Sequence, residues 1–162
     1  MKRLFLLWII ISLSSCAHTP MRTLPEHIKS IYIPIFINQT FQYGLEEVVT
    51  NIVIEEFIKD GRLEVRESAD AELKGTVIFY EKAPFSYDKK GNVDKYKVTI
   101  MVSFGLTDDK LLWQEEWQET VLYIPSTSSY EARDFDITSE QEAINKAISK
   151  IAYYIVSRTI KN

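Results

Sequence analysis

The chain has 162 residues, a formal net charge of −4 and only one cysteine, two histidines and five glycines. Its hydrophobic content of 46% is sufficient for a packed core, and its length fits one domain. The acidic balance argues against nucleic acid as a partner, because nucleic-acid binding depends on neutralising phosphates with Lys and Arg.

The N-terminus has the pattern of a secretory signal. Residues 1–3 are basic, and residues 4–13 form an apolar run much shorter than the roughly 20 residues that span a bilayer. Leu13-Ser14-Ser15-Cys16 ends this run and resembles the lipobox of bacterial lipoproteins. The resemblance implies that residues 1–15 are removed and that Cys16 is lipidated. The alternative is an ordinary signal peptide with an incidental cysteine.

A tether is expected after the cysteine. Residues 17–27 contain two prolines and no periodicity, and fully extended they reach at most about 40 Å. In the well-studied lipoprotein class an Asp after the cysteine marks inner-membrane retention, so Ala17 favours the outer membrane. We therefore expect a lipidated Cys16 and tether over 16–27, and a domain over 28–162 held on the periplasmic side of the outer membrane.

The first elements of the domain are predicted from hydrophobic periodicity. Residues 31–37 have isoleucine at every second position, which predicts a strand, with Pro34 indicating an edge position or a bulge. Apolar residues at helical spacing from Leu45 predict a helix that ends at Gly61. Residues 63–66 form a short second strand, so a right-handed crossover between parallel strands is expected.

Three alternating segments then predict an antiparallel meander, over residues 71–82, 96–107 and 111–123. In the first segment the alternation places Phe79 on the core face and Tyr80 on the opposite face. A closing helix follows Thr138 and Ser139, with Glu142 at capping-box spacing. The predicted fold class is α+β, a two-layer sandwich of two amphipathic helices on one face of a mixed, mainly antiparallel β-sheet.

The residues required for catalysis are scarce. His18 and His27 both precede the first strand, which argues against a histidine base and a histidine-ligated zinc site. We expect no enzyme activity, no metal and no cofactor. Four pairs of adjacent carboxylates are expected to be solvated, because neighbours on a helix diverge; metal ligands or a glycosidase pair are the alternative. The pairs are Glu46-Glu47, Glu55-Glu56, Asp108-Asp109 and Glu115-Glu116.

Two groups of side chains are candidates for binding. Lysines surround the predicted hairpin together with Phe85 and Tyr87, and this group could hold an anionic, partly apolar molecule. The alternative is a solubilising turn with edge-protecting lysines. The lysines are Lys82, Lys89, Lys90, Lys95 and Lys97. Aromatic residues in or after the last strand are expected to be core or half-buried, with an interface role as the alternative. These are Trp113, Trp117, Tyr123 and Tyr130.

The order of short motifs resembles the lipopolysaccharide-assembly lipoprotein LptE family over nearly all of residues 28–160. The opening motif is a strand with proline followed by Asn-x-Thr, here Ile33-Pro34-Ile35-Phe36-Ile37-Asn38-Gln39-Thr40-Phe41. The motifs that follow are Gly44-Leu45-Glu46-Glu47, Asp60-Gly61-Arg62-Leu63, Ala69-Asp70-Ala71 through Gly75, Tyr96-Lys97-Val98 and Trp113-Gln114-Glu115.

This resemblance implies a non-enzymatic partner of the LptD outer-membrane β-barrel. Such a protein plugs the barrel, assists its assembly and binds lipopolysaccharide during delivery to the outer leaflet. The family binds lipopolysaccharide with basic residues around sheet edges and loops, which makes Lys89, Lys90 and Lys95 the candidate binding residues. The alternative is an envelope lipoprotein that scaffolds another periplasmic secretion or cell-wall complex, and an envelope hydrolase is a third possibility.

Overall fold

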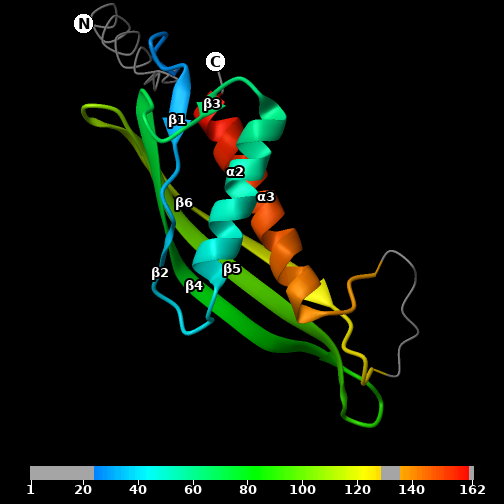
Figure 1. Cartoon of the computed structure of the whole chain (residues 1–162). Coiled ribbons are helices and arrows are strands. Elements are labelled where there is room, and N and C mark those ends of the chain that lie inside the picture. The colour runs from blue at the N-terminus through cyan, green and yellow to red at the C-terminus, as the bar shows by residue number, and fades with distance from the viewer. Residues whose placement is uncertain (1–23, 129–135, 161–162) are drawn as a thin grey trace, which may run out of the picture.

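A computed structural model describes residues 24–128 and 136–160 (Figure 1). Over these residues the chain forms two helices and one open, mixed β-sheet, and both helices lie on the same face of the sheet. This is the predicted α+β sandwich. In chain order the elements are β1 (Ser30–Tyr32), β2 (Ile37–Asn38), α2 (Leu45–Asp60), β3 (Glu64–Val65), β4 (Ala71–Tyr87), β5 (Val93–Thr107), β6 (Leu111–Tyr123) and α3 (Glu140–Ile160). Cys16, His18 and Tyr130 lie outside the described residues.

The sheet combines a parallel half with an antiparallel half. Its strand order is β3-β1-β4-β5-β6, and β2 pairs with β4 beyond β1. The pairs β1–β3, β1–β4 and β2–β4 are parallel, whereas β4–β5 and β5–β6 are antiparallel, which confirms the meander. Strands β4 and β5 are longer than predicted, because their pairing continues to Tyr87 and Val93 beside the turn.

The predicted single strand over residues 31–37 is wrong, because the segment is broken between β1 and β2. Pro34 lies in the break and has no N–H to donate to a neighbouring strand. Two residues on, the amide of Phe36 also leaves the ladder, since its N–H donates to Oγ1 of Thr50 in α2 at 2.9 Å. The break therefore joins this segment to the helix layer as well as to the sheet.

The side chain of Phe36 packs directly on the backbone of β4. Its ring is only 2% exposed and covers Gly75, where a Cβ atom would overlap the ring carbons. A glycine is required here because no larger residue leaves room for the ring. The motif residues Phe36 and Gly75, far apart in sequence, are thus two halves of one contact.

Glycines with a left-handed backbone bound helix α2. Gly44 precedes it with φ 81°, and Gly61 follows it with φ 74° and donates its N–H to the carbonyl of Phe57 at 3.0 Å. Glycine adopts this conformation without the steric cost that other residues incur. The predicted stop at Gly61 is confirmed.

A β-bulge in β4 overturns the predicted positions of Phe79 and Tyr80. The register shifts after Val77, so that Phe79 lies opposite Met101 and Tyr80 lies opposite the fully buried Ile100. An extra residue in one strand exchanges the faces of all residues beyond it. Phe79 is therefore 42% exposed, whereas Tyr80 lies on the helix-covered face.

Helix α3 closes the core as predicted. The N–H of Glu142 donates to Oγ of Ser139 at 3.2 Å, and Oε2 of Glu142 accepts from the N–H of Thr138 at 3.1 Å. The apolar stripe of α3 is buried and includes Ile144, Ala147, Ile148, Ile151 and Ile155. Within the described ranges, neither helix has both the length and the hydropathy of a membrane span.

Hydrogen bonds of Asp70 and Ser30 connect the segments of β4, β1 and β3 at the parallel end of the sheet. Oδ2 of Asp70 accepts from the N–H of Lys29 at 2.9 Å, and from the N–H and hydroxyl of Ser30 at 3.0 and 2.7 Å. Ser30 is fully buried, and its hydroxyl also accepts from Arg66 at 3.0 Å. These hydrogen bonds, with that from Lys29 the largest contribution, lower the pKa of Asp70.

Substituting Gly75 by Ala should destabilise the fold by about 1–3 kcal/mol, because the added methyl group forces the Phe36 ring out of its position. The additional substitution Phe36→Leu, which shortens the opposing side chain, should recover part of this loss. Urea unfolding of the two single variants and the double variant measures the coupling. If the two losses of unfolding free energy simply add, the contact does not constrain the fold as described.

Candidate binding surfaces

The turn between β4 and β5 is held by one aspartate. Oδ1 of Asp88 accepts from the N–H groups of Lys90 and Asn92 at 2.8 and 2.9 Å, and Oδ2 accepts from Nδ2 of Asn92 at 3.1 Å. Gly91 supplies the left-handed residue of the turn, with φ 85°. The first two segments of the predicted meander are therefore joined by a tight, internally hydrogen-bonded turn.

The three candidate lipopolysaccharide-binding lysines lie on this hairpin. Lys89 and Lys90 are exposed in the turn, whereas Lys95 is half-buried in β5, with its Cα opposite that of Ser86. Lys97, the next lysine of β5, forms an ion pair of 3.0 Å with Glu81. Position and exposure therefore make Lys89 and Lys90 the most accessible cations of the hairpin.

Aromatic side chains accompany these lysines. Phe85 and Tyr87, at the end of β4, are both exposed beside the turn. A surface that combines exposed ammonium groups with exposed rings can bind a molecule with phosphate groups and an apolar part. The hairpin end, residues 85–95, therefore combines exposed lysines with exposed rings, and binding of an anionic molecule there stays a prediction.

Lys82 does not belong to that surface, although the sequence grouped it there. It forms an ion pair with Glu140 at the start of α3, and its Nζ lies 5.3 and 5.9 Å from the ring centroids of Tyr96 and Tyr123. Those two rings stack with centroids 5.5 Å apart. The hydroxyl of Tyr80 donates to the other oxygen of Glu140 at 2.6 Å.

Tyr80, Lys82 and Glu140 form a cluster that connects the sheet to the start of α3, and the contacts within it shift the pKa values of Tyr80 and Glu140. Burial, and then the hydrogen bond to Glu140, raise the pKa of Tyr80 well above its usual value. Burial opposes ionisation of Glu140, but the hydrogen bonds from Lys82 and Tyr80 prevail and lower its pKa. Sequence reasoning missed Glu140, because the β-bulge and the distance along the chain conceal the contact.

The tryptophans of β6 pack against α3. Trp117 stacks on Tyr154 with centroids 3.7 Å apart, and the guanidinium of Arg158 lies 4.9 Å from the Trp113 ring centroid. Glu115, which lies between the two tryptophans in the sequence of β6, accepts hydrogen bonds from both Tyr154 and Arg158. These side chains hold the helix on the sheet, as predicted for half-buried aromatics.

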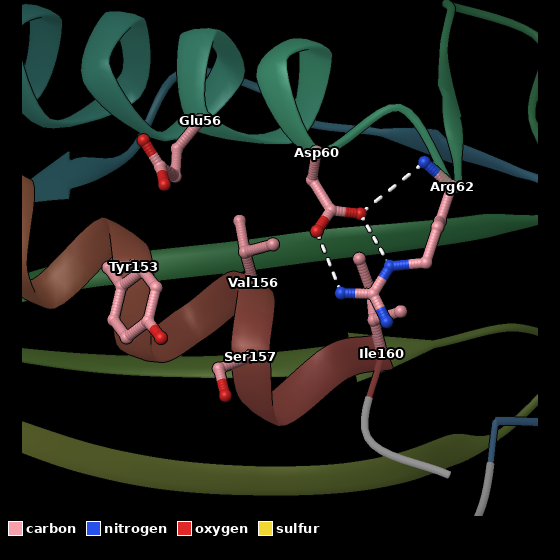
Figure 2. A pocket seen from close by; sticks show the side chains of 7 residues that line it. All are labelled: Glu56, Asp60, Arg62, Tyr153, Val156, Ser157 and Ile160. Carbon is pink, nitrogen blue, oxygen red and sulfur yellow. Dashed lines mark hydrogen bonds and ion pairs between the residues drawn. The ribbon is translucent and has the colours of Figure 1, made fainter.

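A surface cavity of about 290 Å³ lies where the C-terminal ends of α2 and α3 meet (Figure 2). It is lined by Glu56, Asp60, Arg62, Tyr153, Val156, Ser157 and Ile160. Figure 2 shows that Arg62 is already engaged, since its Nε and Nη2 donate to the two oxygens of Asp60 at 2.8 and 2.7 Å. The cavity therefore presents a neutralised ion pair rather than a free cation.

The carboxylate pairs do not converge on a ligand in the part of the chain that the structure describes. Glu115 faces α3, whereas its neighbour Glu116 is exposed on the opposite face of β6. His27, the only histidine among the described residues, lies 3.2 Å from Asp108 near the surface. Over the same residues no group of three His, Cys, Asp or Glu side chains is arranged to hold a metal ion.

The sequence profile of the lipopolysaccharide-assembly LptE family matches residues 28–159, which include every helix and strand described above, except the last residue of α3. The chain belongs to the LptE family. This membership assigns it to lipopolysaccharide assembly. No curated protein matches the chain in sequence.

Solved structures of low sequence identity share the fold. A dodecamer of a PelC point variant from Paraburkholderia phytofirmans has a TM-score of 0.57 and 13% identity, covering 87% of this chain and 94% of that chain. XCC0632 from Xanthomonas campestris has a TM-score of 0.58 and 11% identity, covering 85% and 90%. A minor lipoprotein from Acinetobacter baumannii has a TM-score of 0.50 and 10% identity, covering 81% and 91%.

Replacing Glu140 by Gln should lower the free energy of unfolding by about 0.5–1 kcal/mol near neutral pH, because the partly exposed ion pair with Lys82 is lost. Since folding lowers the pKa of Glu140, the carboxylate stabilises the fold above the ordinary glutamate pKa of about 4.3. This contribution declines as the pH falls through the folded-state pKa, so wild type and E140Q should converge towards pH 3. Urea unfolding between pH 3 and pH 7 measures the difference.

Glu116→Gln is the matched control for this experiment, because Glu116 is exposed on the uncovered face of the sheet. It should unfold like the wild type at every pH. A constant difference between wild type and E140Q down to pH 3 would contradict the assignment.

Proposed function

We propose that this LptE-family protein is an outer-membrane lipoprotein that plugs an LptD-type β-barrel, assists assembly of the barrel and binds lipopolysaccharide during transport to the outer leaflet. The observation that carries this proposal is the family match over residues 28–159. The sequence ahead of that match supports it, because residues 1–16 resemble an export signal that ends in a lipobox, and such a signal would direct the chain to the envelope.

Anchoring at the N-terminus is part of this proposal. Removal of residues 1–15 would leave Cys16 as the acylated first residue, with residues 17–27 as a tether to the domain. Three acyl chains hold a protein at a membrane effectively permanently, since each buried methylene contributes about 0.8 kcal/mol. Ala17 supports the outer membrane as the destination, with the domain on its periplasmic side.

The domain functions in this proposal by binding alone. Its prominent polar clusters, around Glu140, Glu115 and Asp70, join sheet to helix or strand to strand. Groups engaged in this way stabilise the fold, so we assign these clusters a structural role in place of a catalytic one. Plugging and ligand delivery require shape and surface chemistry, which an open sheet covered on one face by helices provides.

Lipopolysaccharide would bind at the hairpin end, residues 85–95. Its phosphates would contact Lys89, Lys90 and Lys95, and its apolar part would lie against Phe85 and Tyr87. The acidic net charge of the chain makes such a local basic group necessary, because the surface as a whole repels phosphate.

Affinity purification of the full-length, lipidated protein from native membranes tests the barrel partner. We expect an LptD-type β-barrel to be recovered in a stoichiometric complex, identified by mass spectrometry. The Cys16→Ala variant, which cannot be acylated, should be depleted from the outer membrane. Recovery of a periplasmic secretion or cell-wall complex in place of the barrel would favour the scaffold alternative and refute the plug.

Charge reversal of the hairpin lysines tests the lipopolysaccharide site. The variant K89E/K90E/K95E should bind purified lipopolysaccharide at least about tenfold more weakly, because each lost charge-assisted contact is worth roughly 1.5–3 kcal/mol. The control K59E/K110E/K146E has the same change in net charge at exposed lysines elsewhere. Equal affinities for the two variants would show that the hairpin is not the site.

A further inference from the structure

The turn between β2 and α2, residues 39–43, presents aromatic side chains to solvent. Phe41 is fully exposed, and Tyr43 retains 94% of its accessible surface. Ile35 and Ile37, just before the turn, are also exposed. Four large apolar side chains without cover on one short segment are unusual for a protein surface and mark an interaction site.

The side chains of Asn38 and Thr40 form hydrogen bonds within this turn. Oδ1 of Asn38 accepts from the N–H and hydroxyl of Thr40 at 3.0 and 2.8 Å, and Nδ2 donates to the carbonyl of Gln42 and to Glu46, both at 2.8 Å. The N–H of Gln42 donates to the hydroxyl of Thr40 at 3.2 Å. The Asn-x-Thr motif thus holds the turn together and leaves the aromatic residues outside.

The turn is also fixed to both layers of the fold. The N–H of Gln39 donates to the carbonyl of Val77 in β4 at 3.0 Å. Just before the turn, Phe36 is bound to Thr50 of α2, and just after it the left-handed Gly44 begins that helix. Phe41 and Tyr43 therefore project from a rigid base, and binding them costs little conformational entropy.

The charge of this segment favours a protein over a lipid surface as the partner. Residues 33–47 contain no Lys or Arg, and they include Glu46 and the exposed Glu47. Segments that insert into membranes place basic residues beside their apolar ones, because lipid head groups are commonly anionic. The turn also lies at the far end of β1 and β2 from residue 24, where the described chain begins (Figure 1).

We propose that the turn 39–43 is a docking element, and that Phe41 and Tyr43 enter an apolar pocket on a protein partner with positive charge facing Glu47. Rigid aromatic residues that become fully buried are the side chains that dominate binding energy at protein interfaces. This inference rests on the proposed function for the identity of the partner, which is then the β-barrel.

Two measurements on full-length, lipidated protein in native membranes test the docking element. A photo-crosslinking amino acid at position 41 should form an adduct with the barrel in clearly higher yield than the same residue at Tyr153. Tyr153 is a matched control, because it is an aromatic residue of α3 with 67% exposure. The variant F41A/Y43A should recover at least about tenfold less barrel than I58A/Y153A, since hot-spot side chains are worth about 2 kcal/mol or more each.

Stability controls separate docking from folding. Phe41 and Tyr43 are exposed, so F41A/Y43A should unfold at the same urea concentration as the wild type. Asn38→Ala keeps both aromatic rings but removes the hydrogen bonds that order the turn. It should give an intermediate recovery of the partner, as expected if the rigid turn contributes to affinity.

The outcomes distinguish this inference from the proposed function. If F41A/Y43A recovers the barrel as well as the wild type does and position 41 gives no adduct, the inference is wrong and the function stands. If the wild type recovers no barrel, the function fails. The inference then survives only if position 41 crosslinks an identified protein that F41A/Y43A no longer recovers. Adducts with lipid alone, or with a second copy of the chain, would overturn it.

Discussion

The contact between the Phe36 ring and the bare backbone of Gly75 determines how the two layers of this fold meet. It holds the broken segment between β1 and β2 flat against β4, while the N–H of Phe36 donates to Thr50 in α2. One residue is thereby in contact with the sheet and the first helix at the same time. The parallel half of the sheet, the entry of α2 and the turn before α2 all depend on this arrangement.

The fold presents its candidate binding chemistry on ordered turns. Asp88 closes the hairpin turn that exposes Lys89 and Lys90, and Asn38 closes the turn that exposes Phe41 and Tyr43. Both turns use a short polar side chain to satisfy backbone groups, so that the neighbouring long side chains point outward. One turn is basic and the other is apolar beside acidic residues, which suits them to different partners.

Hydrophobic periodicity predicted most of the architecture, because amphipathic helices and half-buried strands have strong local patterns. It located α2, α3 and the three long strands, and the glycine after α2 was recognised as its end. The family resemblance identified in the sequence is confirmed by the match over residues 28–159. The elements and motifs named here depend on residues that are close together in the sequence, so a single sequence is sufficient to recognise them.

Contacts between distant residues were not predictable in this way. A single bulge after Val77 exchanged the faces of Phe79 and Tyr80, and it brought Tyr80 to Glu140, far along the chain. Lys82 was assigned to the basic surface because its partner in α3 has no local signal. The break at Pro34 was foreseen only as an edge or a bulge, since the hydrogen bond from Phe36 to Thr50 joins different elements.

The proposal that this sandwich plugs a β-barrel can be tested by cryo-electron microscopy of the complex purified from native membranes. If the sandwich is the plug, density for α2, α3 and the curved sheet will lie within the lumen of the barrel, with the turn 39–43 against its wall. Density for the sandwich entirely outside the barrel, on the periplasmic side, would contradict it.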